Sequence, residues 1–395
     1  MNDSALYCLF FSAVPVFFVF FFAAKINKIF VSDSTFYSAG DDYVSCLRGL
    51  AAILVMIHHS VYMFNYLKYG VWSIFVGEGI FSGVSNKLLL LIAYSGSLPV
   101  MLFFMITGYL FSRKILKAPL NDLTIFFKAR LKRLMPMYGF MVLMVIAVSG
   151  SIEFKEGVNA FSIIKEAARY FTFGVIEPKG LTASVSGFLI VSGVIWTLAY
   201  EWAFYFTLPI LSHFTRSIKS SLITVVSFSC LLMLLLYINV IGEMTFSLLS
   251  CFVGGFLASL SRLLISDRML ILIKSKSFIF ITVTFALLII YMQKFNIYNP
   301  YIVIPLLMFF MSISNGSGNF RFLNTKTIKS AGSVSYSLYL MHGLCMVSVY
   351  HFFSGDLDYL AFASISMMTC AAVSCFTYFI IEKGQYRFLL VRSAI

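Results

Sequence analysis

The sequence predicts an all-α fold, namely a polytopic bundle of transmembrane helices. Three observations support this prediction. First, 60% of the 395 residues are hydrophobic and only 11% are charged, whereas soluble proteins carry about 25% charged residues. Second, the apolar residues form continuous runs and do not alternate with polar ones, which excludes the strands of a membrane β-barrel. Third, most runs approach the roughly 20 residues that a helix needs to cross the hydrocarbon core.

Eleven apolar runs are expected as membrane spans: one extra N-terminal helix and the ten that follow it. They cover residues 5–24, 47–64, 92–112, 134–150, 193–212, 221–241, 244–264, 277–292, 299–314, 331–353 and 359–381. The first run has no basic residues before it and a longer apolar core than a signal peptide, so we expect it to be retained. The predicted organisation is the extra helix with an inner linker at 1–44, a membrane domain at 45–388 and a short cytoplasmic tail at 389–395.

The basic residues indicate how the chain is oriented. If the first span ends in the cytoplasm, the inner segments hold 22 of the 29 Lys and Arg residues. The outer segments then keep seven: Lys68, Lys87, Lys155, Lys165, Arg169, Lys179 and Lys294. Because cytoplasmic loops are enriched in Lys and Arg, this split predicts an outer N-terminus and a cytoplasmic C-terminus. It also explains the net charge of +13 without a nucleic-acid partner.

Cysteine and histidine usage points away from disulfides and metals. The expected outer loops contain none of the seven cysteines, so we expect no disulfide framework. The spacing of Cys and His residues resembles no zinc site. We therefore expect no metal and no tightly bound cofactor.

Ionisable residues inside membrane spans are functional candidates, because burying them in hydrocarbon is costly. Arg48 opens the span in "LRGLAAILVMIHHS", and His59 follows eleven residues later on nearly the same helical face, about 16 Å deeper. His58 points about 80° away from Arg48. Glu201 and His342 lie in the middle of two later spans. We expect His59, Glu201 and His342 to meet in one polar cavity; the alternative is that each is a packing residue with a local partner.

Two segments between spans stand out. The inner segment 113–133 carries seven basic residues and one acid, and its second half is expected to lie along the membrane surface as a short helix. Within it, Arg130 and Arg133 share one helical side at i, i+3 spacing, which suits phosphate oxygens; a positive-inside anchor is the alternative. The outer segment 151–192 is the longest one outside the spans, and its "FSIIKEAARYFTFGVI" is expected to be an interfacial helix or a re-entrant piece.

Six stretches, taken in order, resemble the signature segments of the acyltransferase-3 family of membrane proteins. They are "LRGLAAILVMIHH", "LFFMITGYL", "ARLKRLMPMY", "WTLAYEWAFYFTLP", "SYSLYLMH" and "IEK". The resemblance runs from about residue 45 to 388, and six segments in the right order make it specific. The residues that match family motifs are Arg48, His59, Arg130, Arg133, Trp196, Glu201, Phe204, Tyr205, Pro209, Ser335, Tyr336, Tyr339 and His342.

The resemblance implies a multi-pass O-acyltransferase of the bacterial cytoplasmic (inner) membrane. Such enzymes most often move an acetyl group from acetyl-CoA to a hydroxyl of a lipid-linked surface glycan such as an O-antigen, a capsule or an exopolysaccharide. His59 is then expected to be the base or a transiently acylated residue, since histidine titrates near neutral pH. Glu201 and Arg48 complete the expected catalytic set, Glu201 by orienting or charge-balancing His59. Arg48, Arg130 and Arg133 would also hold the donor phosphates. The expected supporting residues are His58, Trp196, Tyr205, Tyr336 and His342.

Four positions depart from the family pattern, and other functions stay open. Ser45 stands where the family often has Asp, Trp202 replaces a frequent second acid, and Gly343 and Gly384 stand near usual prolines. We expect no soluble esterase-like domain after the membrane part. The alternatives are a proton-coupled transporter that uses the buried His and Glu residues, a membrane scaffold without catalysis, and the transfer of another acyl group such as succinyl.

Overall fold

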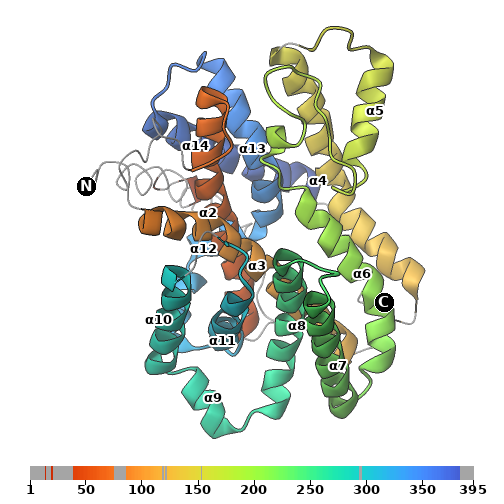
Figure 1. Ribbon diagram of the computed structural model, residues 1–395, viewed down its shortest axis with the longest axis vertical. Coiled ribbons are helices and arrows are strands. Elements are labelled where there is room, and N and C mark those ends of the chain that lie inside the picture. Colours follow the sequence, from red (N-terminus) through yellow and green to blue (C-terminus); the bar gives the residue numbers. More distant parts are fainter. Residues whose placement is uncertain are drawn as a thin grey trace.

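A computed structural model of the chain describes residues 39–74, 86–117, 122–152, 154–292 and 296–382, together with Val14, Val19, Phe20 and Leu120. This part of the chain contains helices and no strand, so the predicted all-α class is confirmed (Figure 1). The α-helices are α2 (Ala39–Tyr69), α3 (Asn86–Lys117), α4 (Leu123–Ile152), α5 (Ala160–Tyr170), α6 (Trp196–Phe214), α7 (Ile218–Tyr237), α8 (Glu243–Leu264), α9 (Asp267–Ile273), α10 (Lys276–Met292), α11 (Val303–Ser314), α12 (Lys326–Ser333), α13 (Ser335–Phe352) and α14 (Tyr359–Thr377). The short turns are η1 (Leu189–Val191), η2 (Pro300–Ile302), η3 (Gly318–Asn324) and η4 (Tyr378–Glu382).

Six of the described helices are long and apolar enough to cross a membrane, and the number rises to eight if two bent pairs each count as one span. The pairs are α9 with α10, bent by 55°, and η2 and α11 with η3, bent by 78°. The expected count of eleven is therefore not confirmed. Helices α6 and α13 exist where spans were expected, although neither is among these six. The expected first span, 5–24, lies outside the described residues except for three helical positions.

Helix α2 is the centre of the bundle and contacts α3, α11, α12, α13 and α14 (Figure 1). Helices α3 and α8 approach each other most closely, because glycines face backbone there. A Cβ on Gly108 would lie 2.2 Å from the carbonyl oxygen of Phe252, and one on Gly255 would lie 2.0 Å from that of Met105. Small residues allow membrane helices to pack backbone to backbone, so these glycines determine the spacing of α3 and α8.

The basic segment differs from the expectation of a short surface helix. Helix α3 continues to Lys117, and α4 already begins at Leu123 and runs for 30 residues. Arg130 and Arg133 therefore lie in the first turns of a long helix that continues past Pro136. The apolar residues that follow directly are helix-compatible, so nothing interrupts the helix between the basic turns and the span.

The segment 154–195 contains the expected helix, α5, packed on the end of α4. Asn159 caps α5 by accepting from Ser162 N at 2.9 Å. The buried carboxylate of Glu166 accepts from Gly180 N at 2.6 Å and from Arg169 at 3.0 Å. These bonds tie α5 to the loop at Gly180. They also satisfy the oxygens of a buried carboxylate, which would otherwise be costly to bury.

Candidate active site

His59 of α2 and His342 of α13 meet in the middle of the bundle. His59 Nδ1 lies 2.8 Å from His342 Nε2, and the two rings are nearly parallel, with an interplanar angle of 4° and centroids 5.0 Å apart. His342 is fully buried, whereas His59 is partly accessible. The expectation that these two histidines converge is therefore confirmed.

The hydrogen bonds of His342 determine where the protons of this pair lie. His342 Nδ1 is 2.9 Å from the carbonyl oxygen of Tyr339 and 3.3 Å from that of Leu338. A carbonyl oxygen only accepts, so His342 Nδ1 carries the proton and His342 Nε2 is an acceptor. His59 Nδ1 must then donate to it, and the neutral His59 ring keeps its lone pair on Nε2. This arrangement suits a general base, because the second nitrogen is held in one tautomer.

His58 has different surroundings, as the helical geometry predicted. Its ring packs against Gly96 of α3, where a Cβ would lie 2.4 Å from it. Its Nδ1 lies 3.3 Å from the carbonyl oxygen of Ile92, and its ring centroid is 4.5 Å from that of Tyr62. His58 therefore fills the contact between α2 and α3. Its ring lies edge-on to that of His59, with centroids 5.2 Å apart, but it takes no part in the His59–His342 hydrogen bond.

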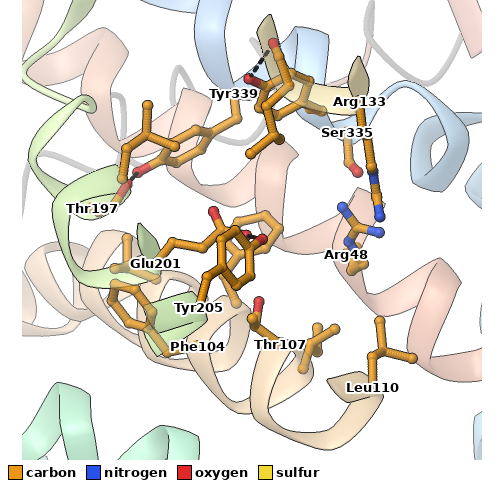
Figure 2. Close-up of a pocket in the computed structure, with 16 residues that line it drawn as sticks. Arg48, Phe104, Thr107, Leu110, Arg133, Thr197, Glu201, Tyr205, Ser335 and Tyr339 are labelled. Atoms are coloured by element: carbon orange, nitrogen blue, oxygen red, sulfur yellow. Dashed lines mark hydrogen bonds between the residues drawn. The ribbon is translucent and has the colours of Figure 1, made fainter. Parts of the chain in front are cut away.

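A cavity of about 100 Å³ lies between α2, α3, α4, α6 and α13. Figure 2 shows the guanidinium groups of Arg48 and Arg133 close together on one side, with Thr197 and Tyr339 on the opposite side. We call this cavity the arginine pocket. It is lined by Arg48, Val100, Phe103, Phe104, Ile106, Thr107, Leu110, Arg133, Leu134, Thr197, Leu198, Glu201, Tyr205, Ser335, Tyr336 and Tyr339.

Glu201 lies between the two ends of the arginine pocket (Figure 2). Tyr205, one turn later on α6, donates its hydroxyl hydrogen to Glu201 Oε1. Among the described residues, no hydrogen bond joins Glu201 to either histidine of the pair. The expected meeting of Glu201 with His59 and His342 is therefore not seen; Glu201 faces the arginines of the pocket instead.

Tyr339 connects the arginine pocket to the histidine pair. Its ring lines the pocket and its hydroxyl lies 3.0 Å from Thr197 Oγ1, while its backbone oxygen accepts from His342. The ring centroids of Tyr339 and His342 are 6.2 Å apart. The end of the pocket opposite the arginines is thus adjacent to the histidine pair.

The two arginines of the basic segment have different surroundings. Arg133 lines the arginine pocket, but Arg130 does not. The Arg130 guanidinium lies over the ring of Phe111, with its Cζ 5.0 Å from the centroid, and over that of Phe126 at 5.9 Å. Such a cation–π arrangement holds the side chain beside the pocket.

Tyr336 and Trp196, two further predicted supporting residues, also differ in whether they line the arginine pocket. Tyr336 lines the arginine pocket and donates to the carbonyl oxygen of Leu134 at 3.1 Å. Trp196 instead packs on Tyr200 and Tyr298, with ring centroids 5.7 and 6.0 Å apart, and is outside the pocket lining.

Three aromatic residues beside His59 were missed by the sequence reasoning. Tyr62 and Tyr66 follow His59 at i+3 and i+7, so helical spacing already placed them on its face. The Trp72 ring lies beyond the end of α2, and its centroid is 5.8 Å from His59, 5.6 Å from Tyr62 and 6.2 Å from Tyr66. Asn65 helps hold this turn by donating to the carbonyl oxygen of Ser73 at 2.8 Å. We call Tyr62, Tyr66 and Trp72 the aromatic platform.

No group of three or more His, Cys, Asp or Glu side chains within the described ranges is arranged to hold a metal ion. The polar chemistry of this region is instead supplied by two histidines, arginines, tyrosines and the carboxylates of Glu201 and the buried Glu382, the latter close enough to Arg48 and Arg133 to interact with both.

Comparison with known proteins gives one match. A family model described as an acyltransferase domain, Acyl_transf_3, matches residues 41–379. This range includes the histidine pair, the arginine pocket and the aromatic platform. No match was found to a curated protein or to a solved structure.

Proposed function

Because this chain belongs to the acyltransferase-3 family and is therefore a membrane acyltransferase, we propose that it transfers an acetyl group from acetyl-CoA to a hydroxyl of a cell-surface glycan. The observation that carries this proposal is the histidine pair, in which the lone pair of His59 Nε2 is available next to a pocket with two guanidinium groups. The acceptor class is a lipid-linked glycan such as an O-antigen, a capsule or an exopolysaccharide.

The donor is proposed to enter at the arginine end of the pocket. Guanidinium forks bind phosphate oxygens in a bidentate manner, so Arg48 and Arg133 would hold the diphosphate of coenzyme A. The rise along α2 from Arg48 to His59 is about 16 Å, comparable with the length of an extended pantetheine arm. A cavity of about 100 Å³ has the volume of only a few water molecules. Only the thioester end would therefore be enclosed, and the nucleotide would lie outside.

The chemistry proposed for His59 is proton removal from the acceptor. His59 Nε2 takes the hydroxyl proton while the sugar oxygen attacks the thioester carbonyl, and the C–S bond then breaks. The coenzyme A thiolate receives the proton from the His59 imidazolium, so charge and protons balance. In the two-step alternative, His59 Nε2 itself attacks the carbonyl, and the C–S bond breaks to release the coenzyme A thiolate. The sugar oxygen then attacks the acyl-histidine while its proton passes to the thiolate, and the C–N bond breaks to restore neutral His59. In both routes His342 Nε2 stabilises the positive His59 ring by accepting its Nδ1–H.

Glu201 is proposed to act through the pocket. With Tyr205 hydrogen-bonded to it, its carboxylate offsets part of the positive charge of Arg48 and Arg133 and keeps the pocket from binding unrelated anions too tightly. Arg130, held beside the pocket on Phe111, adds a more distant positive charge for the donor phosphates.

The aromatic platform is proposed to bind the acceptor sugar. Flat aromatic rings stack on the C–H faces of pyranose rings, and the Trp72 ring is close enough to His59 to present a stacked sugar to the base. Tyr66 also ties the platform to the segment 154–195, since its hydroxyl accepts from Ser186 N at 3.4 Å.

The proposed topology has eleven spans, an outer N-terminus and a cytoplasmic C-terminus in the bacterial inner membrane. Cysteines introduced at Lys117 and Lys179, both exposed, test it with a thiol reagent that cannot cross the membrane. External reagent should label position 179 and leave 117 unlabelled. The exposed Cys230 is replaced by serine to lower the background. The reverse labelling would place the arginine pocket on the side without coenzyme A and overturn the donor assignment.

The decisive experiment measures acyl transfer by the purified protein in lipid nanodiscs. Labelled acetyl-CoA and a lipid-linked glycan should yield labelled glycan with the natural chain. His59→Ala should abolish the product, and His58→Ala should retain it, since His58 packs between α2 and α3 and takes no part in the His59–His342 hydrogen bond. An active His59→Ala variant, or proton-coupled uptake of a solute without any acylated product, would overturn the proposal.

A further inference from the structure

A second cavity, of about 220 Å³, lies between α3, α6, α7 and α8 and is independent of the proposed chemistry. Its lining contains no charged residue, and the side chains are mostly Phe, Leu, Val and Ile. We call it the apolar cavity. It exceeds the roughly 150 Å³ of an engineered dry cavity that binds benzene, so its size suits a stretch of hydrocarbon.

The few hydroxyl groups that line the apolar cavity are already satisfied. Ser112 donates to Ser259 at 2.7 Å, Thr207 to the carbonyl oxygen of Phe204 at 2.8 Å, and Thr224 to that of Ser220 at 2.9 Å. A buried water needs two to four polar partners, and the lining offers it only a few hydroxyl oxygens, whose hydrogens are already donated. The cavity therefore favours a hydrocarbon over water.

The apolar cavity is open toward the bilayer between α6 and α7. Ala203 and Thr207 belong to its lining and are exposed at the surface. Exposed apolar side chains such as Ile210 and Ile223 lie on the same two helices, outside the lining of the cavity. Only 17% of the apolar span of α7 is buried, so lipid chains surround the opening on that side.

A cluster of cations lies at the ends of the helices that form the cavity. Lys114 and Lys117 end α3, and Arg216 and Lys219 lie at the turn from α6 to α7. All four are exposed, and neither stretch of sequence contains an acid. Lys and Arg near the membrane surface attract anionic headgroups by about 1 kcal/mol each.

Three phenylalanines separate the apolar cavity from the arginine pocket. Phe104 lines the pocket, whereas Phe204 and Phe252 line the cavity. The Phe252 ring centroid lies 4.8 Å from that of Phe104 and 4.3 Å from that of Phe204. A chain in the cavity would thus touch the wall of the pocket without entering it.

We propose that the apolar cavity binds one acyl chain of an anionic phospholipid, whose headgroup lies at Lys114, Lys117, Arg216 and Lys219. The chain enters between α6 and α7 and ends against Phe204 and Phe252. It fills the space on one side of α6 and so fixes the position of the helix that carries Glu201 and Tyr205.

The test uses the purified protein in nanodiscs of phosphatidylcholine doped with phosphatidylglycerol that carries a photoreactive group in one acyl chain. After irradiation, peptide mapping should place the label on cavity residues such as Phe228 and Phe252. Thr207→Phe, which blocks the opening, should remove most of this label. The matched variant Ile210→Phe, one turn away on the lipid-facing side of the same helix, should keep it.

The headgroup is tested by removing charge. Replacing Arg216 and Lys219 together with Gln should weaken phosphatidylglycerol labelling by up to about 30-fold at low salt, whereas Gln at Arg268 and Lys276 should leave it unchanged. Label spread evenly over lipid-facing helices and insensitive to Thr207→Phe would overturn the proposal. Loss of the label on adding a long-chain acyl-CoA would also overturn it, because the cavity would then belong to the donor site.

Discussion

Replacing His342 with alanine removes the acceptor for His59 Nδ1, which lies 2.8 Å away. The bond becomes charge-assisted when His59 turns into an imidazolium during the reaction. Hydrogen bonds to charged groups contribute about 1.5–3 kcal/mol, and about 1.4 kcal/mol corresponds to a tenfold change in rate. We therefore expect kcat to fall by about 10- to 150-fold. The KM for acetyl-CoA should change little, since an interaction that strengthens only in the transition state acts on kcat.

The assay is steady-state transfer from labelled acetyl-CoA to a lipid-linked glycan, with the amount of folded protein measured for each variant. His342→Gln should recover part of the rate, because its amide oxygen can accept from His59. His351, on the same helix but at its far end, is the control, and His351→Gln should behave like the natural protein. A folded His342→Ala variant with an unchanged kcat, or one altered only in donor KM, would refute the assignment of the histidine pair.

Three further predictions concern donor, acceptor and packing. Arg133→Ala should raise the KM for acetyl-CoA by about 10- to 150-fold and Arg130→Ala by less, since only Arg133 lines the pocket; equal effects in the transfer assay would contradict this. Trp72→Ala should raise the glycan KM by about 2- to 10-fold, as expected for one lost aromatic contact, and a change confined to the donor would remove Trp72 from the acceptor site. Gly255→Ala should lower the free energy of unfolding by about 1–3 kcal/mol, because its Cβ would lie 2.0 Å from a backbone oxygen of α3. The control is Gly139→Ala, which has no neighbour within 4 Å and should be neutral or stabilising by up to about 1 kcal/mol. If Gly255→Ala and Gly139→Ala shifted the thermal unfolding temperature equally, α3 and α8 would be able to move apart.

Much of the helical frame followed from periodicity and composition. The spacing of Arg48 and His59 predicted two functional groups on one face of one helix, and the structure places Arg48 in the pocket and His59 in the histidine pair. The number of spans was harder to predict, because apolar runs that look alike in the sequence form either long helices or short and bent ones. The bends between α9 and α10 and between α11 and η3 also depend on how neighbouring helices pack.

The partners of the buried polar groups could be predicted only in part. Glu201 was expected to meet the histidines, but Tyr205 at i+4 satisfies its carboxylate locally, and that helical spacing was visible in the sequence. Gly343, noted as a departure from a usual proline, faces Ser192, where a Cβ would lie 2.4 Å from the backbone nitrogen; the need for that close approach cannot be seen in the sequence.

The sequence alone determined that this chain forms membrane helices, where its positive charge is concentrated and which ionisable residues had to be buried. These properties follow from local physics: hydropathy, helical period and the cost of placing charge in hydrocarbon. Only the tertiary structure decided that His59 pairs with His342, that Arg133 and not Arg130 reaches the pocket, and that Trp72 folds back onto His59. Partner choice depends on the distances between helices far apart in the chain. Those distances are set by close packing, such as that of Gly255 on α3, which no single segment encodes.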